Sequence, residues 1–330
     1  MTLRPTTLWA SLSGLLLATV FASLAVGAVS VSPTELVAWM LGGPLERSQE
    51  LVLSTIRLPR VVLGIAVGAS LAVSGALLQG LFRNPLASPA LIGVSSGASV
   101  GAALAIVLLG TAGALLPVCA FLGGAVATLA ALRIGTVRGR TDTASLLLAG
   151  IAINAVAGAA TGLLVYLSDE AQLRTLTFFS LGSLGGANWS DLTVALPLAA
   201  VPVLAIPWLR GPLNALLLGE DEARHLGVDV QRVKALLVAV VCIGVGACVA
   251  VSGVIGFVGL AVPHLVRLAV GPNHELVLPG SALLGAGLLV AADTAARTVV
   301  APAELPIGIL TTLLGGPFFL WLLLRARGRT

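Results

Sequence analysis

The sequence has little charge. Only 10% of its 330 residues are Asp, Glu, Lys or Arg, whereas 58% are hydrophobic. A water-soluble domain carries about 25% charged residues, so this shortage argues against an ordinary soluble enzyme. Mean hydropathy is +1.07, and a bilayer accepts apolar side chains while penalising charge. The apolar runs are continuous, unlike the alternating strands of a membrane β-barrel, so the composition predicts an all-α membrane protein.

Lysine is almost missing. Lys234, in the stretch QRVKALL, is the single lysine among 18 basic residues. A Walker A loop needs Gly-Lys-Ser/Thr to hold phosphates, so the chain cannot hydrolyse ATP by that route. Cys119, Cys242 and Cys248 lie inside apolar runs and lack metal-ligand spacing. We therefore expect small buried thiols and no metal site.

Acidic residues are also scarce inside the apolar runs. Asp293 is the one acid well inside a run, and Arg297, four positions later, is its expected partner. Carriers driven by ion gradients usually place carboxylates near the bilayer midplane, so the shortage of such carboxylates gives little support to an ion-coupled carrier. We keep that carrier as the alternative of a different class. His225, His264 and His274 are all predicted on the cytoplasmic side. No Ser/His/Asp or Cys/His arrangement in the sequence is placed for catalysis. We predict no catalytic residue, which argues against a third reading, a membrane enzyme.

The apolar runs predict ten membrane spans in a single domain over residues 1–330, because about 20 apolar residues cross a bilayer. The predicted spans are 8–30, 58–82, 92–110, 113–133, 143–168, 191–209, 232–251, 255–271, 276–299 and 306–325. The first run is too long for the core of a signal peptide, so it is retained as a helix.

Basic residues orient this bundle. With the N-terminus inside, 13 of the 18 basic residues share the inner face, which the positive-inside rule makes cytoplasmic. These are Arg4, Arg83, Arg133, Arg138, Arg140, Arg210, Arg224, Arg232, Lys234, Arg267, Arg325, Arg327 and Arg329. Both termini are therefore expected in the cytoplasm.

Two segments interrupt the rhythm of spans and short loops. Residues 212–230 combine leucines at helical spacing with an acidic cluster, which predicts short amphipathic helices broken at Gly219. A helix lying in the headgroup layer is the alternative, but such helices are usually cationic, so we favour a protein partner. Residues 169–190, on the outer side, are polar, aromatic and rich in glycine. They predict a short surface or re-entrant helix that lines a path.

Arginines gather at the outer face as well. Arg57 and Arg60 frame the motif RLPR at the start of a span, where Pro59 suits a first helical turn. Their guanidinium groups, with that of Arg297, could extend to lipid headgroups. They could equally bind the carboxylates of a partner.

Six stretches resemble, in order, the FecCD-type permeases, the membrane subunits of ABC importers for iron-siderophores, haem and vitamin B12. They are RLPRVVLGIAVGASLAVSGALLQGLFRNPLASPALIGVSSGASVG (57–101), LLLAGIAIN (146–154), LRTLTFFSLGSLGGANW (173–189), LNALLLGEDEARHLGV (213–228), GFVGLAVPHLVRLAVGPNH (256–274) and ELPIGILTTLLGGPFFLWLL (304–323). The resemblance covers roughly residues 8 to 325.

This resemblance implies a ten-span type II importer permease in the bacterial inner membrane, which forms a homodimer around a translocation path. It implies two cytoplasmic ATPase subunits carrying ATP and Mg²⁺, and a periplasmic binding protein that docks on Arg57, Arg60 and Arg297. The cytoplasmic gate falls on Asn84, Leu86, Thr143 and Ala144. Ala144 departs from the small polar residue expected there. The contact with the ATPase falls on Leu213, Leu217, Gly219, Glu220, Glu222 and Leu226.

The stretch TFFSLGSLGGANW looks more like the haem permeases than the others, so haem is the expected cargo, with iron-siderophore or vitamin B12 as alternatives. Arg174, Phe178 and Phe179 are the expected contacts on the path, with Arg174 near a propionate. Axial iron ligation would fall to Tyr166, Met40 or a cysteine, none of them well placed. We therefore expect apolar handling of the cargo and no cofactor bound by this chain.

Overall fold

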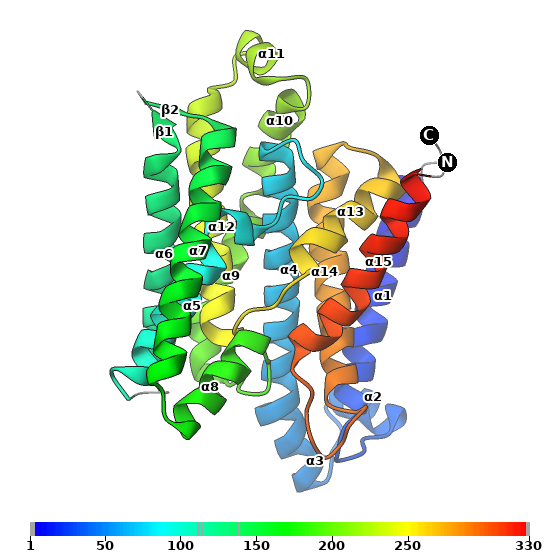
Figure 1. Ribbon diagram of the computed structural model, residues 1–330. Coiled ribbons are helices and arrows are strands. Elements are labelled where there is room, and N and C mark those ends of the chain that lie inside the picture. The colour runs from blue at the N-terminus through cyan, green and yellow to red at the C-terminus, as the bar shows by residue number, and fades with distance from the viewer. Residues whose placement is uncertain (1–3, 111–112, 114, 138, 328–330) are drawn as a thin grey trace.

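The computed structural model is a bundle of long helices with small additional elements at both ends (Figure 1). It describes residues 4–327 except 111, 112, 114 and 138, so Arg138 and Arg329 lie outside the described residues. The first described helix begins, and the last one ends, at the end that carries α11 and the β1–β2 hairpin (Figure 1). We call this the terminal end, and the end that carries α2, α3 and α8 the opposite end.

The elements are α1 (Pro5–Ala25), α2 (Pro33–Met40), α3 (Arg47–Leu51), a π-helical turn (Val52–Arg57), α4 (Leu58–Leu81), a 3-10 turn (Pro89–Ile92), α5 (Val94–Val107), α6 (Leu115–Ile134), β1 (Thr136–Val137), β2 (Arg140–Thr141), α7 (Thr143–Leu167), α8 (Glu170–Leu181), α9 (Trp189–Leu204), α10 (Ile206–Leu216), α11 (Glu220–His225), α12 (Val230–Ser252), α13 (Val258–Val270), α14 (His274–Ala296) and α15 (Ile307–Arg327). The strands are antiparallel, with Thr136 opposite Thr141.

Every predicted apolar run overlaps a helix, but the helices differ in length. Among the described residues, seven helices are long and apolar enough to cross a bilayer, and α5 and α13 are apolar but shorter. α15 is a further apolar helix of 21 residues. The 14 residues of α5 rise only about 21 Å at 1.5 Å per residue, less than a hydrocarbon core of about 30 Å. Predicted spans 92–110 and 255–271 were thus too long. A left-handed Gly93 starts α5, and Phe257, also at positive φ, starts α13.

The second span begins earlier than predicted. α3, the π-helical turn and α4 form one continuous helix from Arg47 to Leu81, 35 residues long, whereas the sequence predicted a start at residue 58. The π-helical turn ends on Arg57. π-Turns inside α-helices occur frequently at functional sites, and hydropathy does not reveal them.

α4 lies at the centre of the bundle, and glycines bring its backbone against two neighbours. A Cβ on Gly68 would lie 2.3 Å from the carbonyl oxygen of Gly285 in α14. A Cβ on Gly75 would lie 1.7 Å from the carbonyl oxygen of Gly259 in α13. Small residues permit such approaches in membranes, where helix association depends on van der Waals packing.

Replacing Gly75 with alanine should therefore destabilise the bundle by more than about 3 kcal/mol, the upper end of the usual cost of overpacking. The added methyl group meets backbone, which cannot rotate away. Gly14→Ala is the matched control, because no atom lies within 4 Å of its Cβ position. Heating both variants in detergent and measuring the folded fraction by size exclusion tests this. Equal unfolding midpoints would contradict it.

Candidate functional site

The segment 212–230, which we call the acidic elbow, projects from the terminal end of the bundle (Figure 1). α10 stops at Leu216, and α11 starts after Gly219, whose φ is +124°. Residues other than glycine rarely adopt this backbone conformation, because their Cβ atom clashes with the backbone. A Cβ on Gly219 would also lie 2.5 Å from Oε2 of Glu222. The predicted helix break at Gly219 is confirmed.

The elbow exposes only part of the expected contact surface. Leu217 and Leu226 are 41% and 64% exposed, and Glu222 is also exposed. Leu213 is fully buried in the core, so its expected contact with a partner is corrected. Helical spacing alone did not show which leucines face inward, because α10 packs one face against α14 and α4.

Glu220 is held by neighbouring cations. Its Oε1 lies 2.7 Å from Nζ of Lys234, and its Oε2 lies 3.3 Å from Arg224. Arg224 also pairs with Asp221 at 2.5 Å. The elbow therefore carries its own ion pairs, and its acids are not all free for a partner.

The two expected gate segments are exposed in the single chain. Asn84 accepts a hydrogen bond from the amide of Leu86 at 2.9 Å, and Leu86 is 51% exposed. Thr143 and Ala144 begin α7, and Ala144 is exposed.

The 3-10 turn that follows the first gate segment packs against the middle of α7. Asn154 donates a hydrogen bond to the carbonyl oxygen of Ala90 at 2.9 Å. Gly150 permits close contact, because a Cβ there would lie 1.8 Å from the carbonyl oxygen of Leu91. The turn that follows the first gate segment is thus attached to α7, the helix that begins with the second gate segment.

The segment 169–190 contains the short helix α8, as the sequence predicted. Asp169 caps it, accepting a hydrogen bond from the amide of Gln172 at 2.8 Å, while the Gln172 side chain accepts one from the amide of Asp169. Arg174 is exposed and lies over the ring of Phe178 at 5.9 Å, and Phe178 is 47% exposed. Phe179 is half-buried, and its carbonyl oxygen accepts a hydrogen bond from Val254. Arg174 and Phe178 therefore present a cation and an aromatic face together.

The three arginines expected to dock a partner are buried. Arg57 and Arg60 are 3% and 6% exposed, and the side chain of Arg297 is 10% exposed. Arg57 donates to the carbonyl oxygens of Leu24, Ala25 and Val29. Arg297 donates to the carbonyl and hydroxyl oxygens of Ser23. These arginines tie the opposite end together within the chain.

Asp293 has a stronger partner than the sequence indicated. Nε of Arg60 donates to both carboxylate oxygens of Asp293 at 2.9 Å, and Arg60 also pairs with Glu304 at 2.9 Å. The predicted partner Arg297 lies 3.9 Å away. The Arg60 pair joins α4 to α14, 233 positions apart, a separation at which helical spacing gives no signal.

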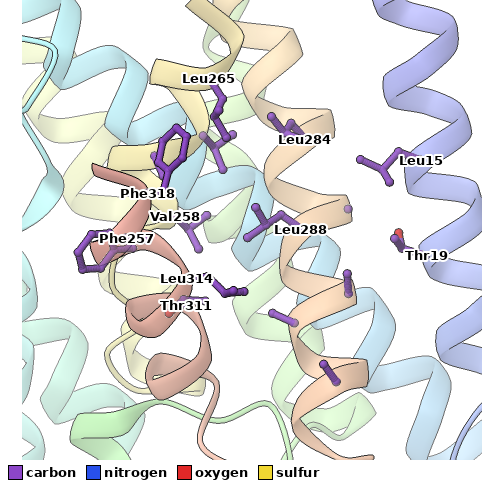
Figure 2. Close-up of a pocket in the computed structure, with 17 residues that line it drawn as sticks. Leu15, Thr19, Phe257, Val258, Leu265, Leu284, Leu288, Thr311, Leu314 and Phe318 are labelled. Carbon is purple, nitrogen blue, oxygen red and sulfur yellow. The ribbon is translucent and has the colours of Figure 1, made fainter. Parts of the chain in front are cut away.

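An apolar cavity of about 470 Å³ lies between α1, α13, α14 and α15. Figure 2 shows its lining, including Leu15, Leu288 and Phe318. None of the expected path or gate residues lines it. Within the described residues, no cluster of three or more histidine, cysteine or acidic side chains could hold a metal.

The expected iron ligands are dispersed. Tyr166 and Met40 are 85% and 64% exposed, and they belong to α7 and α2. Cys242 and Cys248 are buried, and Cys119 is half-buried.

Comparison with known proteins identifies the architecture. The model of the FecCD transport family matches residues 15–325. The hemin transport system permease protein HmuU of Yersinia pestis is 53% identical, over 82% of this chain and 83% of its own length. The vitamin B12 import system permease protein BtuC of Escherichia coli O9:H4 is 43% identical, over 96% and 94%.

A solved inward-facing structure assigned to the metal-chelate type of ABC transporter has a TM-score of 0.87 and 35% identity, covering 98% of this chain and 100% of that one. PsaBC from Streptococcus pneumoniae shares the fold, with a TM-score of 0.59 and 19% identity over 82% and 92% of the two chains.

Proposed function

This chain belongs to the FecCD transport family and is the membrane permease of an ABC importer, and on that basis we propose that it imports haem through a path between two copies of itself. The hemin permease HmuU, at 53% identity, supports the choice of cargo. Cobalamin permeases at 48% and 43% identity make vitamin B12 the second candidate, and iron-siderophore remains the third.

We place the acidic elbow in the cytoplasm, in contact with the two partner ATPases. Both described ends of the chain share its side of the bundle (Figure 1), as does the excess of arginine in the sequence. In this arrangement the seven long helices of the described chain, together with α5, α13 and α15, give ten crossings. The elbow offers Leu217, Leu226 and Glu222 to a partner.

The exposed gate segments support a path between protomers. Asn84, Leu86, Thr143 and Ala144 all remain accessible in a single chain, at least in part. α7 also exposes Leu148, Val156 and Leu163 at 68%, 71% and 60%. ATP binding would move the elbows and open the segments next to them, which is an alternating-access step.

Because Arg57, Arg60 and Arg297 are largely buried, they expose little surface to the binding protein. Arg60 pairs with Asp293 and Glu304, and Arg297 lies 3.9 Å from Asp293, whereas Arg57 donates to backbone carbonyl oxygens. Glu304 is 47% exposed at its side chain. We propose that a carboxylate of the binding protein displaces Glu304 from Arg60, because Arg60 can then form a new charge-assisted pair.

An ion-coupled carrier is the alternative of a different class, and the geometry of Asp293 disfavours it. The Asp293 carboxylate is 2% exposed and already paired with Arg60, so it is not free to bind a travelling cation.

Import by the purified complex tests the proposed function. Proteoliposomes holding the permease, the ATPase and the binding protein should take up haem only with ATP, and excess iron-siderophore or vitamin B12 should not compete. A catalytically inactive ATPase should abolish uptake. Uptake driven by an ion gradient without ATP would establish the carrier instead, and competition by vitamin B12 would reassign the cargo.

Replacing Arg174 with alanine should slow haem import by up to about fivefold, since an exposed ion pair with a propionate would contribute about 0.2–1 kcal/mol. The guanidinium would contact a haem propionate beside the Phe178 ring. Arg47→Ala is the control, because Arg47 is also an exposed arginine at the opposite end. Initial uptake rates at equal complex concentration provide the measurement. Unchanged import by Arg174→Ala would remove this residue from the path.

A further inference from the structure

The single lysine of the chain is buried where three elements meet. Lys234 lies in the first turns of α12, and its side chain is 2% exposed. Its Nζ lies 2.7 Å from Oε1 of Glu220 in α11 and donates a hydrogen bond of 2.8 Å to the carbonyl oxygen of Thr141 in β2. One ammonium group therefore joins the acidic elbow to the hairpin before α7.

Packing alone does not require a charge at this position. A buried ammonium is unfavourable unless an anion and hydrogen-bond acceptors surround it, and an apolar residue of similar volume is often equally stable or better. Here Glu220 and the Thr141 carbonyl satisfy the ammonium. The chain thus uses its only lysine to connect two segments that could have packed through leucine or methionine.

The hairpin is held at a second point by the same helix. The amide of Thr141 donates to Oε1 of Gln231 at 2.8 Å, so both polar groups of the Thr141 backbone bind side chains of α12. Asp142 then caps α7 by accepting a hydrogen bond from the amide of Ser145 at 2.8 Å. Hydrogen bonding with Ser145 holds the pKa of Asp142 below its usual range, and the positive charge of Lys234 lowers that pKa further. The gate residues Thr143 and Ala144 follow directly.

Other ion pairs of the elbow do not reach this far. Arg224 binds Glu220 and Asp221 within α11 itself, and Arg232 binds Asp229 at the start of α12. Lys234 instead contacts α11 on one side and β2 on the other.

We propose that Lys234 is a positioning residue that transmits movement of the acidic elbow to the gate at the start of α7. When an ATPase displaces α11, the pair between Glu220 and Lys234 pulls on the Thr141 carbonyl and shifts Thr143 and Ala144. This inference rests on the proposed contact between elbow and ATPase, but it does not depend on which cargo is carried.

Gate accessibility in the assembled complex tests the proposal. The reporter is Ala144→Cys in a Cys119→Ser background, because Cys242 and Cys248 are buried. A hydrophilic maleimide labels it with and without ATP, using an ATPase that binds but does not hydrolyse the nucleotide. With Lys234 present, we expect ATP to change the labelling rate at least fivefold. Lys234→Met should reduce this change below twofold while the ATPase stays bound, and Lys234→Arg should restore most of it.

Arg232→Met is the matched control, since Arg232 lies two residues away with a side chain 89% exposed, and it should behave as the parent. If Lys234→Met fails to assemble, Glu220→Gln carries the test, because it weakens the same ion pair from a partly exposed side chain. A full ATP response in Lys234→Met, or in Glu220→Gln where that variant is used, overturns the proposal. An absent ATP response in the parent also overturns it, whereas failure of haem uptake with a normal response rejects only the cargo.

Discussion

Replacing Asp293 with alanine should destabilise the bundle by about 3–5 kcal/mol, because it removes one partner of a buried ion pair and leaves the other. Arg60 would keep only Glu304, which is half exposed, and its Nε would lose both acceptors. The loss should appear as a lower unfolding midpoint in detergent and as less folded protein extracted from membranes.

Two variants make this expectation specific. Arg60→Leu combined with Asp293→Leu removes both charges and should recover most of the stability, since apolar pairs replace buried ion pairs at little cost. Glu46→Ala changes an exposed acid at the opposite end and should have little effect. An Asp293→Ala variant as stable as Glu46→Ala would show that the pair contributes nothing.

Reversing the charge of Glu222 to lysine should lower ATP-driven import at least tenfold. Glu222 is exposed beside Gly219 on the acidic elbow, and a close like-charge contact in an interface costs several kcal/mol. The proposed partner contact, and not the fold, should fail. Co-purification of the ATPase and the import rate are the two measurements.

Glu220→Lys should reduce import too, but for a second reason. It places a cation against buried Lys234, so its unfolding midpoint should fall, whereas that of Glu222→Lys should not. Glu275→Lys is the control, being an equal charge reversal at an exposed acid in the first turn of α14. Normal import by Glu222→Lys would place the ATPase contact elsewhere.

Local patterns in the sequence predicted much of the fold. Continuous apolar runs located the helices, because a bilayer demands them over a fixed length. Gly219 marked the elbow, since a turn depends on a few adjacent residues, and the polar segment 169–190 indicated a short helix. The Asp169 cap of α8 was not predicted. The shortening of α5 and α13 escaped prediction, because their apolar runs continue through non-helical backbone at Gly93 and Phe257.

The candidate site was less predictable, because its contacts join residues far apart in the chain. Arg60 and Asp293 are separated by 233 positions and Lys234 and Thr141 by 93. Spacing within one helix pointed to Arg297 as the partner of Asp293 and did not reveal Arg60. The burial of Leu213 likewise depends on the packing of α10 against other helices.

The concealment of Lys234 has a practical consequence for studies of the assembled importer. Amine-reactive reagents should leave this subunit unmodified beyond its N-terminal amine while the ammonium stays 2% exposed. Lysine-directed cross-links recovered from such a complex then originate on the companion subunits. Modification of Lys234 by such a reagent, detected as a mass increase, would show that α11 moves away from α12 and exposes the ammonium group.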